Sequence, residues 1–157
     1  MNAPSELALT EQARDEISRH AAETFPEECC GIILHNGRSY EVHRCKNIQN
    51  QLRALDPETY PRTAATAYAM DPKELEAVLQ EAETRGARIT AFYHSHPEHE
   101  AYFSAEDRAF AMPFGEPTFP EAAQIVISIY NGTVRRISAY VWSEEKKDFI
   151  EIPVRKS

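Results

Sequence analysis

The feature that most restricts the fold of this chain lies in residues 88–107, where an apolar segment ends in two histidines, His94 and His96, followed at once by Pro97. Side chains two residues apart project from the same face of a strand, so both imidazoles point to one side if residues 88–94 form a strand. Ser104 and Asp107 follow at a spacing of three, which is typical of an N-cap and the first turn of a helix. The end of a strand and the start of a helix are therefore expected to meet at one point.

Two imidazoles and a carboxylate at one point are a typical ligand set for zinc, and a hydrolytic zinc site leaves its fourth position to water. The pattern therefore predicts His94, His96 and Asp107 as metal ligands. A histidine pair alone is weak evidence, because structural histidine pairs are commoner than metal sites, and Ser104 with Asp107 can be helix capping alone. His99 is disfavoured as a fourth ligand, since four protein ligands would close the site to water.

The first third of the chain predicts a helix followed by a β-hairpin. An apolar stripe with helical spacing indicates a helix from about Leu7 to Thr24, with Ser5 or Thr10 as its N-cap. Two strands, 27–35 and 39–44, are expected on either side of an Asn-Gly pair, which is a strong signal for a two-residue hairpin turn.

The rest of the chain predicts helices interleaved with strands. Asp71 as N-cap, Glu74 as the partner in a capping box and Gly86 as C-cap delimit a helix, and a short strand at 67–70 is expected before it. The remaining expectations are irregular segments at 46–66 and 112–120, a short helix at 104–111, a hairpin of 124–130 with 133–142, and a final strand at 148–154. This order indicates an α/β fold with a mixed, mostly antiparallel β-sheet flanked by α-helices.

Size and composition narrow the class of protein. At 157 residues the chain is most simply a single domain, 1–157, large enough for a core without disulfides. Three cysteines make a poor disulfide framework, and the absence of a secretory signal and of any apolar run near ~20 residues predicts a cytoplasmic protein without a membrane partner. A net charge of −8 argues against nucleic acid as a partner.

The spacing of the motif is that of a known family. His94-Ser95-His96-Pro97, six residues, Ser104, two residues and Asp107 resembles the signature of the JAMM (MPN+) metallopeptidases at every defined position. The family also has a glutamate just upstream of a Cys-Gly strand start, and Glu28-Cys29-Cys30-Gly31 resembles that element, which leaves Glu27 as a surface residue. The resemblance extends from about Pro26 to the last hairpin and implies the JAMM/MPN fold, which is related to that of cytidine deaminases.

The resemblance also implies a mechanism, and the chemistry of the residues agrees with it. Zinc on His94, His96 and Asp107 would lower the pKa of a water molecule towards ~7. Glu28 would take a proton from that water and pass it to the leaving amine. Ser104 would donate a hydrogen bond to the oxyanion as the scissile carbonyl becomes tetrahedral.

For a small member of this family the resemblance implies cleavage of a peptide or isopeptide bond at the Gly-Gly C-terminus of a ubiquitin-like or sulfur-carrier protein. An extended diglycine tail suits a narrow site beside a sheet edge. The segments 47–66 and 112–120 are candidates for the walls of its channel, and equally for surface loops without function. The aromatic residues near the motif can likewise serve only as loop anchors; they are Tyr102, Phe103, Phe114 and Phe119.

Two other functions compete with this hypothesis. Metal-free MPN domains are scaffolds for assembly, but they typically lack the histidines or the aspartate that this chain retains. A zinc deaminase would need a Pro-Cys-x-x-Cys element, which the sequence does not contain.

Overall fold

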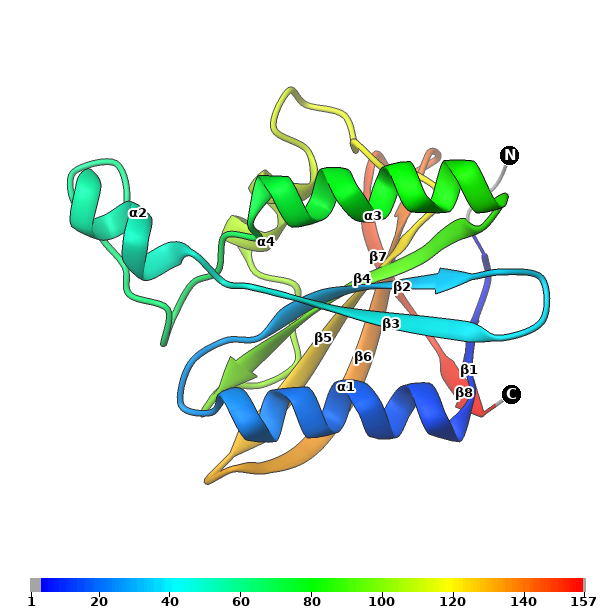
Figure 1. The fold of residues 1–157 in the computed structure, drawn as a ribbon, viewed down its shortest axis with the longest axis horizontal. Helices are drawn as coiled ribbons and strands as arrows, with labels where there is room; N and C mark the ends of the chain where they lie inside the picture. Colours follow the sequence, from blue (N-terminus) through cyan, green and yellow to red (C-terminus); the bar gives the residue numbers. More distant parts are fainter. Residues whose placement is uncertain (1–3, 157) are drawn as a thin grey trace.

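The computed structural model describes residues 4–156, and over that range it shows a β-sheet with helices on both faces (Figure 1). The helices are α1 (Glu11–Thr24), α2 (Gln49–Leu55), α3 (Pro72–Arg85) and α4 (Ala105–Ala111). The strands are β1 (Leu7–Leu9), β2 (Cys30–His35), β3 (Tyr40–Cys45), β4 (Arg88–Pro97), β5 (Ala123–Tyr130), β6 (Thr133–Ser143), β7 (Asp148–Ile152) and β8 (Val154–Lys156). The expected α/β class with a mostly antiparallel sheet is confirmed.

Strand β4 occupies an inner position in the sheet of six strands, which we call the central sheet. The strand order within the described chain is β3-β2-β4-β5-β6-β7. Strand β4 pairs antiparallel with β2 and parallel with β5, whereas the other neighbours in the central sheet pair antiparallel. The histidine motif therefore lies on a strand with hydrogen-bonded neighbours on both sides, which fixes the positions of its side chains.

Helices α1 and α3 cover opposite faces of the central sheet, and a hydrophobic core lies under each (Figure 1). Neighbouring side chains of a strand alternate between these faces, so Cys29 packs in the core under α1 and Cys30 in the core under α3. The two neighbouring thiols therefore lie on opposite faces of the central sheet. None of the helices within residues 4–156 is long and apolar enough to cross a membrane.

The first helix begins later than the sequence pattern predicts. Residues Leu7–Leu9 form β1, which pairs parallel with β8, and α1 begins at Glu11 after the N-cap Thr10. The Thr10 hydroxyl accepts a hydrogen bond from the backbone N–H of Ala13. The expected start at Leu7 is wrong because Leu7 and Leu9 are buried on one face of a strand. Leu9 continues the four-residue apolar spacing of α1, so the helical stripe extends past the N-cap.

The segment 46–66, expected to be irregular, contains the short helix α2. This helix projects away from the central sheet (Figure 1). Its C-terminal residue Leu55 is 84% exposed. Because few apolar side chains of α2 are buried, its sequence carries no helical period. The strand expected at 67–70 is reduced to a single bridge between Asn47 and Met70. Segment 112–120 contains neither helix nor strand, as expected.

Two helix starts test the predicted caps. The Asp71 carboxylate caps α3 by accepting from the N–H of Lys73, but Glu74 does not close a capping box, because its carboxylate accepts from the N–H of Lys46 instead. At α4 the full capping box is present: the Ser104 hydroxyl accepts from the N–H of Asp107, and the Asp107 carboxylate accepts from the N–H of Ser104. This reciprocal pair fixes Asp107 on the first turn of α4.

Close contact between Gly31 and Tyr93 yields a prediction about stability. The two residues are paired between β2 and β4, and a methyl group on Gly31 would overlap the buried ring of Tyr93. Gly31→Ala should lower the free energy of unfolding by about 1–3 kcal/mol, as over-packing of a core does. Urea unfolding of the unmodified protein and of Gly31→Ala, each with and without Tyr93→Leu, measures this effect. An equal loss in the two backgrounds would show that the Tyr93 ring is not the cause.

Candidate metal centre and catalytic cleft

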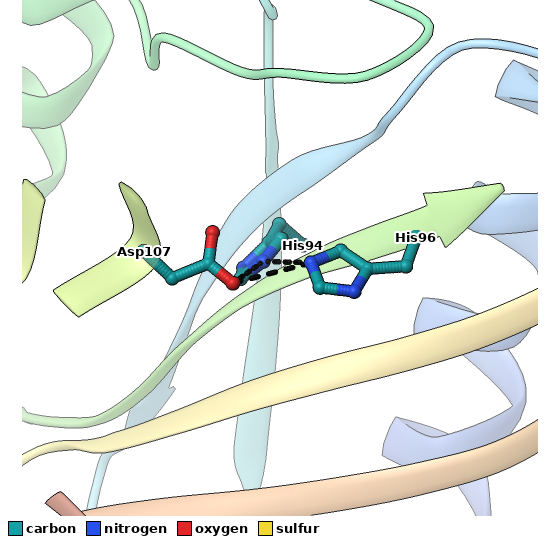
Figure 2. Close-up of side chains that lie close together, drawn as sticks. All are labelled: His94, His96 and Asp107. Carbon is teal, nitrogen blue, oxygen red and sulfur yellow. Dashed lines mark hydrogen bonds and ion pairs between the residues drawn. The ribbon is translucent and has the colours of Figure 1, made fainter. Parts of the chain in front are cut away.

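The two histidines lie near the C-terminal end of β4 with their side chains on the same face of the central sheet. Both are buried, and the spacing of two places them on the side of α4 rather than α1 (Figure 2). Ser95 between them faces the other way, and its hydroxyl accepts a hydrogen bond of 2.8 Å from the N–H of Cys29. The strand thus presents two imidazoles on one face, while the Ser95 side chain on its other face binds the residue that precedes β2.

Asp107 reaches the same point from the first turn of α4. Its Oδ2 lies 3.1 Å from Nε2 of His94 and 3.2 Å from Nε2 of His96, and the two Nε2 atoms are 3.1 Å apart (Figure 2). A strand end and a helix start thus converge, as the spacing of the motif predicts.

These three residues fit a metal ion. Ligand bonds of about 2.0–2.1 Å in a tetrahedron place neighbouring ligand atoms roughly 3.3–3.4 Å apart, close to the observed triangle of 3.1–3.2 Å. The Nδ1–H of His96 donates to the carbonyl of Glu100 at 3.0 Å, which leaves the Nε2 lone pair facing the centre of the triangle. Within residues 4–156 this is the one group of three or more His, Cys, Asp or Glu side chains that could hold a metal ion. Their assignment as ligands stays a prediction.

The surroundings favour a neutral His94 and an ionised Asp107, the forms that bind metal. Burial lowers the pKa of His94 despite the neighbouring Asp107. Burial would raise the pKa of Asp107, but its interactions with His94 and His96 outweigh burial and hold this pKa well below its usual range. Asp107 is therefore an anion near neutral pH.

Glu28 lies just before β2 and lines the same cleft as Ser104, His96 and Asp107. The side chain is only 5% exposed. Burial, with smaller contributions from the negative charges of Asp107 and Glu106, raises the pKa of Glu28 to about 9. A carboxyl group that holds a proton this readily near an anionic ligand has the properties of a proton carrier.

Ser104 is half-buried and combines its role as a helix cap with a position on the cleft wall. Its hydroxyl oxygen accepts from the N–H of Asp107 at 3.0 Å, so the hydroxyl proton remains free to donate towards the cleft. Its assignment as a catalytic residue, like that of Glu28, stays a prediction.

The cleft beside these residues has a volume of about 840 Å³. One wall is the segment 59–68, which follows α2, and the other consists of residues 96–104 and α4. An ion pair of 2.9 Å between Arg62 and Glu106 joins the two walls. The segment 47–66 thus contributes several lining residues, whereas the segment 112–120 contributes only Pro113 to this cleft.

Aromatic side chains contact the histidines of the candidate metal centre. Tyr102 contacts His96 edge to face at 5.2 Å between ring centroids. Phe103 and Phe119 are loop anchors, because they pack in buried clusters, whereas Phe114 is 95% exposed and anchors nothing. His99 is exposed on the cleft and is not one of the three grouped side chains.

Tyr68 is the residue at the centre that the sequence analysis missed. Its ring stacks on His94 with centroids 4.5 Å apart and 23° between planes, and its other neighbour is Phe110 at 5.5 Å. No periodic pattern marks Tyr68, since it lies in an irregular segment well before β4 in the chain.

Comparison with known proteins agrees with this geometry. The model of the family described as prokaryotic homologs of the JAB domain matches residues 10–143. A desampylase of Haloferax volcanii is 34% identical over 108 residues, which are 66% of this chain and 71% of that protein.

Solved structures show the same fold. A protein of Salinibacter ruber gives a TM-score of 0.61 at 25% identity and one of Desulfitobacterium hafniense 0.69 at 20%; each match covers 96% of this chain and 92% of the other. A JAB1/MPN domain protein of Archaeoglobus fulgidus gives 0.52 at 14%, with 95% of this chain and 99% of that chain covered. The fold is therefore that of JAB/MPN domains.

The geometry predicts one zinc ion per chain, held by Asp107 and the two histidines. Asp107→Ala should weaken zinc binding by about 10–100-fold. It should also lower the stability of α4, because it removes half of the capping box. Ser104→Ala is the matched control: it breaks the same capping box at a cost of about 1 kcal/mol but leaves the three ligand atoms. Calorimetric titration with zinc measures the effect, and unchanged affinity in Asp107→Ala would contradict the assignment.

Buried Glu28 predicts a pH-dependent stability of the metal-free protein. Because its pKa rises from 4.5 to about 9 on folding, the folded chain keeps a proton that the unfolded chain releases between these values. The stability that this proton contributes is fully present below pH 4.5 and is lost as the pH rises towards 9.

Glu28→Gln does not titrate, so in chelator it should be more stable than the unmodified protein by roughly 1–3 kcal/mol at pH 8, with the difference vanishing near pH 4.5. Thermal unfolding across this range measures it. Glu27→Gln, which makes the same change at an exposed neighbouring side chain, is the matched control. A constant difference for Glu28→Gln would contradict the raised pKa.

Proposed function

This chain belongs to the prokaryotic homologues of the JAB domain, and from that membership we propose that it is a zinc-dependent metallopeptidase. It hydrolyses a peptide or isopeptide bond at the Gly-Gly C-terminus of a ubiquitin-like or sulfur-carrier protein. The observation that carries the proposal is the convergence of His94, His96 and Asp107 in a cleft that Glu28 also lines.

Zinc is the metal proposed, because two neutral imidazoles and one carboxylate are a donor set typical of hydrolytic zinc sites. Bound there, zinc would supply Lewis acidity that polarises the scissile carbonyl and makes a water molecule nucleophilic near neutral pH. The chain provides the charge balance: Asp107 is ionised, and burial keeps His94 neutral. The hydrogen bond from His96 to Glu100 holds that imidazole in the required tautomer.

Glu28 is the proposed proton carrier of the reaction. Its carboxylate takes a proton from the attacking water and gives it to the leaving amine, so one group acts first as base and then as acid. In the metal-free chain, burial and the nearby Asp107 raise its pKa to about 9, so Glu28 holds a proton at neutral pH. The positive charge of a bound zinc ion would lower this pKa, so that the carboxylate accepts the proton from water and later releases it to the amine.

Ser104 is proposed to stabilise the oxyanion. Its oxygen already accepts from the N–H of Asp107, which orients the hydroxyl, and its proton can donate to the developing charge. The capping box of α4 therefore preorganises a donor at the same time as it positions a ligand.

The substrate is proposed from the cleft and from the relative. A desampylase at 34% identity supports hydrolysis of conjugates of a ubiquitin-like protein. The cleft runs between the segment 59–68 and α4, and a tail of two glycines can lie extended in it without side chains of its own. The net charge of −8 supports a protein rather than a nucleic acid as partner, and three free buried thiols support the cytoplasm as the compartment.

A cleavage assay tests the proposal directly. Fusions of ubiquitin-like and sulfur-carrier proteins to a reporter through a Gly-Gly junction should be cut by the zinc-loaded protein and not in the presence of chelator. Glu28→Gln should lower turnover by about 10²–10⁴-fold with zinc still bound, whereas Glu27→Gln, one residue away and exposed, should keep it.

The assay has two outcomes that contradict the proposal. Full activity in Glu28→Gln would remove Glu28 from the mechanism. Tight binding of zinc without cleavage of any fusion would favour the alternative, a non-catalytic MPN-type scaffold.

A further inference from the structure

Asn47, which follows β3 and precedes α2, has every hydrogen-bonding position of its side chain occupied. Its Nδ2 donates to the carbonyl of Glu28 at 3.0 Å and to that of Ala67 at 3.1 Å. Its Oδ1 accepts from the N–H of Gln49 and from that of Ala69, both at 3.0 Å. An asparagine amide has two donor hydrogens and two acceptor lone pairs, so this half-buried side chain is fully satisfied.

These bonds attach the amide to both sides of the site. Glu28, the proposed proton carrier, is held through its carbonyl by Asn47, and its N–H donates to the carbonyl of Ala64 at 2.8 Å. The next residue, Cys29, is held to Ser95 on β4 by hydrogen bonds of 2.8 and 3.1 Å. Glu28 therefore lies between the segment 64–69 and the strand that carries the two histidines.

The other two contacts flank Tyr68. Asn47 binds the carbonyl of Ala67 and the N–H of Ala69, the residues on either side of Tyr68. The ring of Tyr68 stacks on His94 at 4.5 Å. The Asn47 side chain thus binds the backbone at two places. One is Glu28, and the other is the pair of residues that flank Tyr68, whose ring packs on His94.

We propose that Asn47 is a positioning residue, whose amide sets the place of Glu28 and of the Tyr68 ring relative to His94. The inference rests on the proposed function, since it assigns the amide to the placement of the proton carrier. Asn47 touches neither substrate nor metal in this role: it acts through the backbone of Glu28 and through Tyr68. Its importance comes from geometry, because a proton carrier displaced by about 1 Å can lose as much as 10²-fold in rate.

Asn47→Asp tests the donor half of the amide. The carboxylate keeps the two acceptor contacts with Gln49 and Ala69 but places oxygen against the carbonyls of Glu28 and Ala67. We expect kcat to fall by about 10–100-fold, KM to change by less than about threefold, and zinc content to stay at the level of the unmodified protein. Asn36→Asp, the same change at the distant β2–β3 turn (Figure 1), is the control and should leave all three unchanged.

A second measurement on metal-free protein does not depend on catalysis. Amide hydrogen exchange should be faster at Glu28 in Asn47→Asp, while Ala69, whose N–H keeps its acceptor, and the amides of β5 exchange as before. Asn47→Ser, which removes all four bonds, should speed exchange at both Glu28 and Ala69, and it serves if the aspartate variant does not fold. If no fusion is cleaved by the unmodified protein, the proposed function fails, and hydrogen exchange still decides whether Asn47 holds Glu28.

Three results would overturn the inference. Unchanged exchange at Glu28 in Asn47→Asp, or at Glu28 and Ala69 in Asn47→Ser, would show that the amide does not hold these residues. A raised KM at constant kcat would make Asn47 part of the substrate wall instead. Loss of zinc in proportion to loss of activity would mean that the amide acts on the metal ligands and not on Glu28.

Discussion

The rest of the site depends on the contacts that the carboxylate of Asp107 makes with Ser104, His94 and His96. This carboxylate accepts the N–H of Ser104 and so begins α4, and the same oxygen faces the Nε2 atoms of both histidines. A helix start and the end of β4 are joined at one atom. Because the capping box is local and β4 lies inside the central sheet, neither partner can shift without breaking hydrogen bonds of its own. Rigid elements on both sides are what a preorganised site requires.

The same arrangement has a cost in stability. Asp107 is ionised, Glu28 lines the same cleft and is buried, and their repulsion adds to the burial that raises the pKa of Glu28. A buried carboxyl group in this position is unfavourable for the metal-free fold at neutral pH. Such a cost is common at functional sites, and a cation between the ligands would offset it.

Local sequence patterns predicted most of the fold, because the interactions that form these elements join residues close together in the chain. Alternation, Asn-Gly turns and the caps of α3 and α4 depend on near neighbours in the chain, and the central sheet and these helices were expected for that reason. The start of α1 was misplaced because Leu9, which lies in β1, continues the four-residue apolar spacing of the helix. Helix α2 was not expected because it buries little and shows no period, and Glu74 bonds Lys46, a partner that no local rule could identify.

The sequence by itself determined the chemistry of the centre: two histidines on one face of a strand, a serine and an aspartate at capping distance, and a glutamate before a Cys-Gly strand. Because these spacings are short, the backbone geometry of a strand or of a helix turn fixes the direction in which each side chain points. Only the tertiary structure decided how the segments meet: Glu28 beside the triad, Tyr68 stacked on His94, and Asn47 bonded to both sides. Those contacts join segments far apart in the chain, and they arise from the packing of the segment 47–69 against β2 and β4, which no residue spacing encodes.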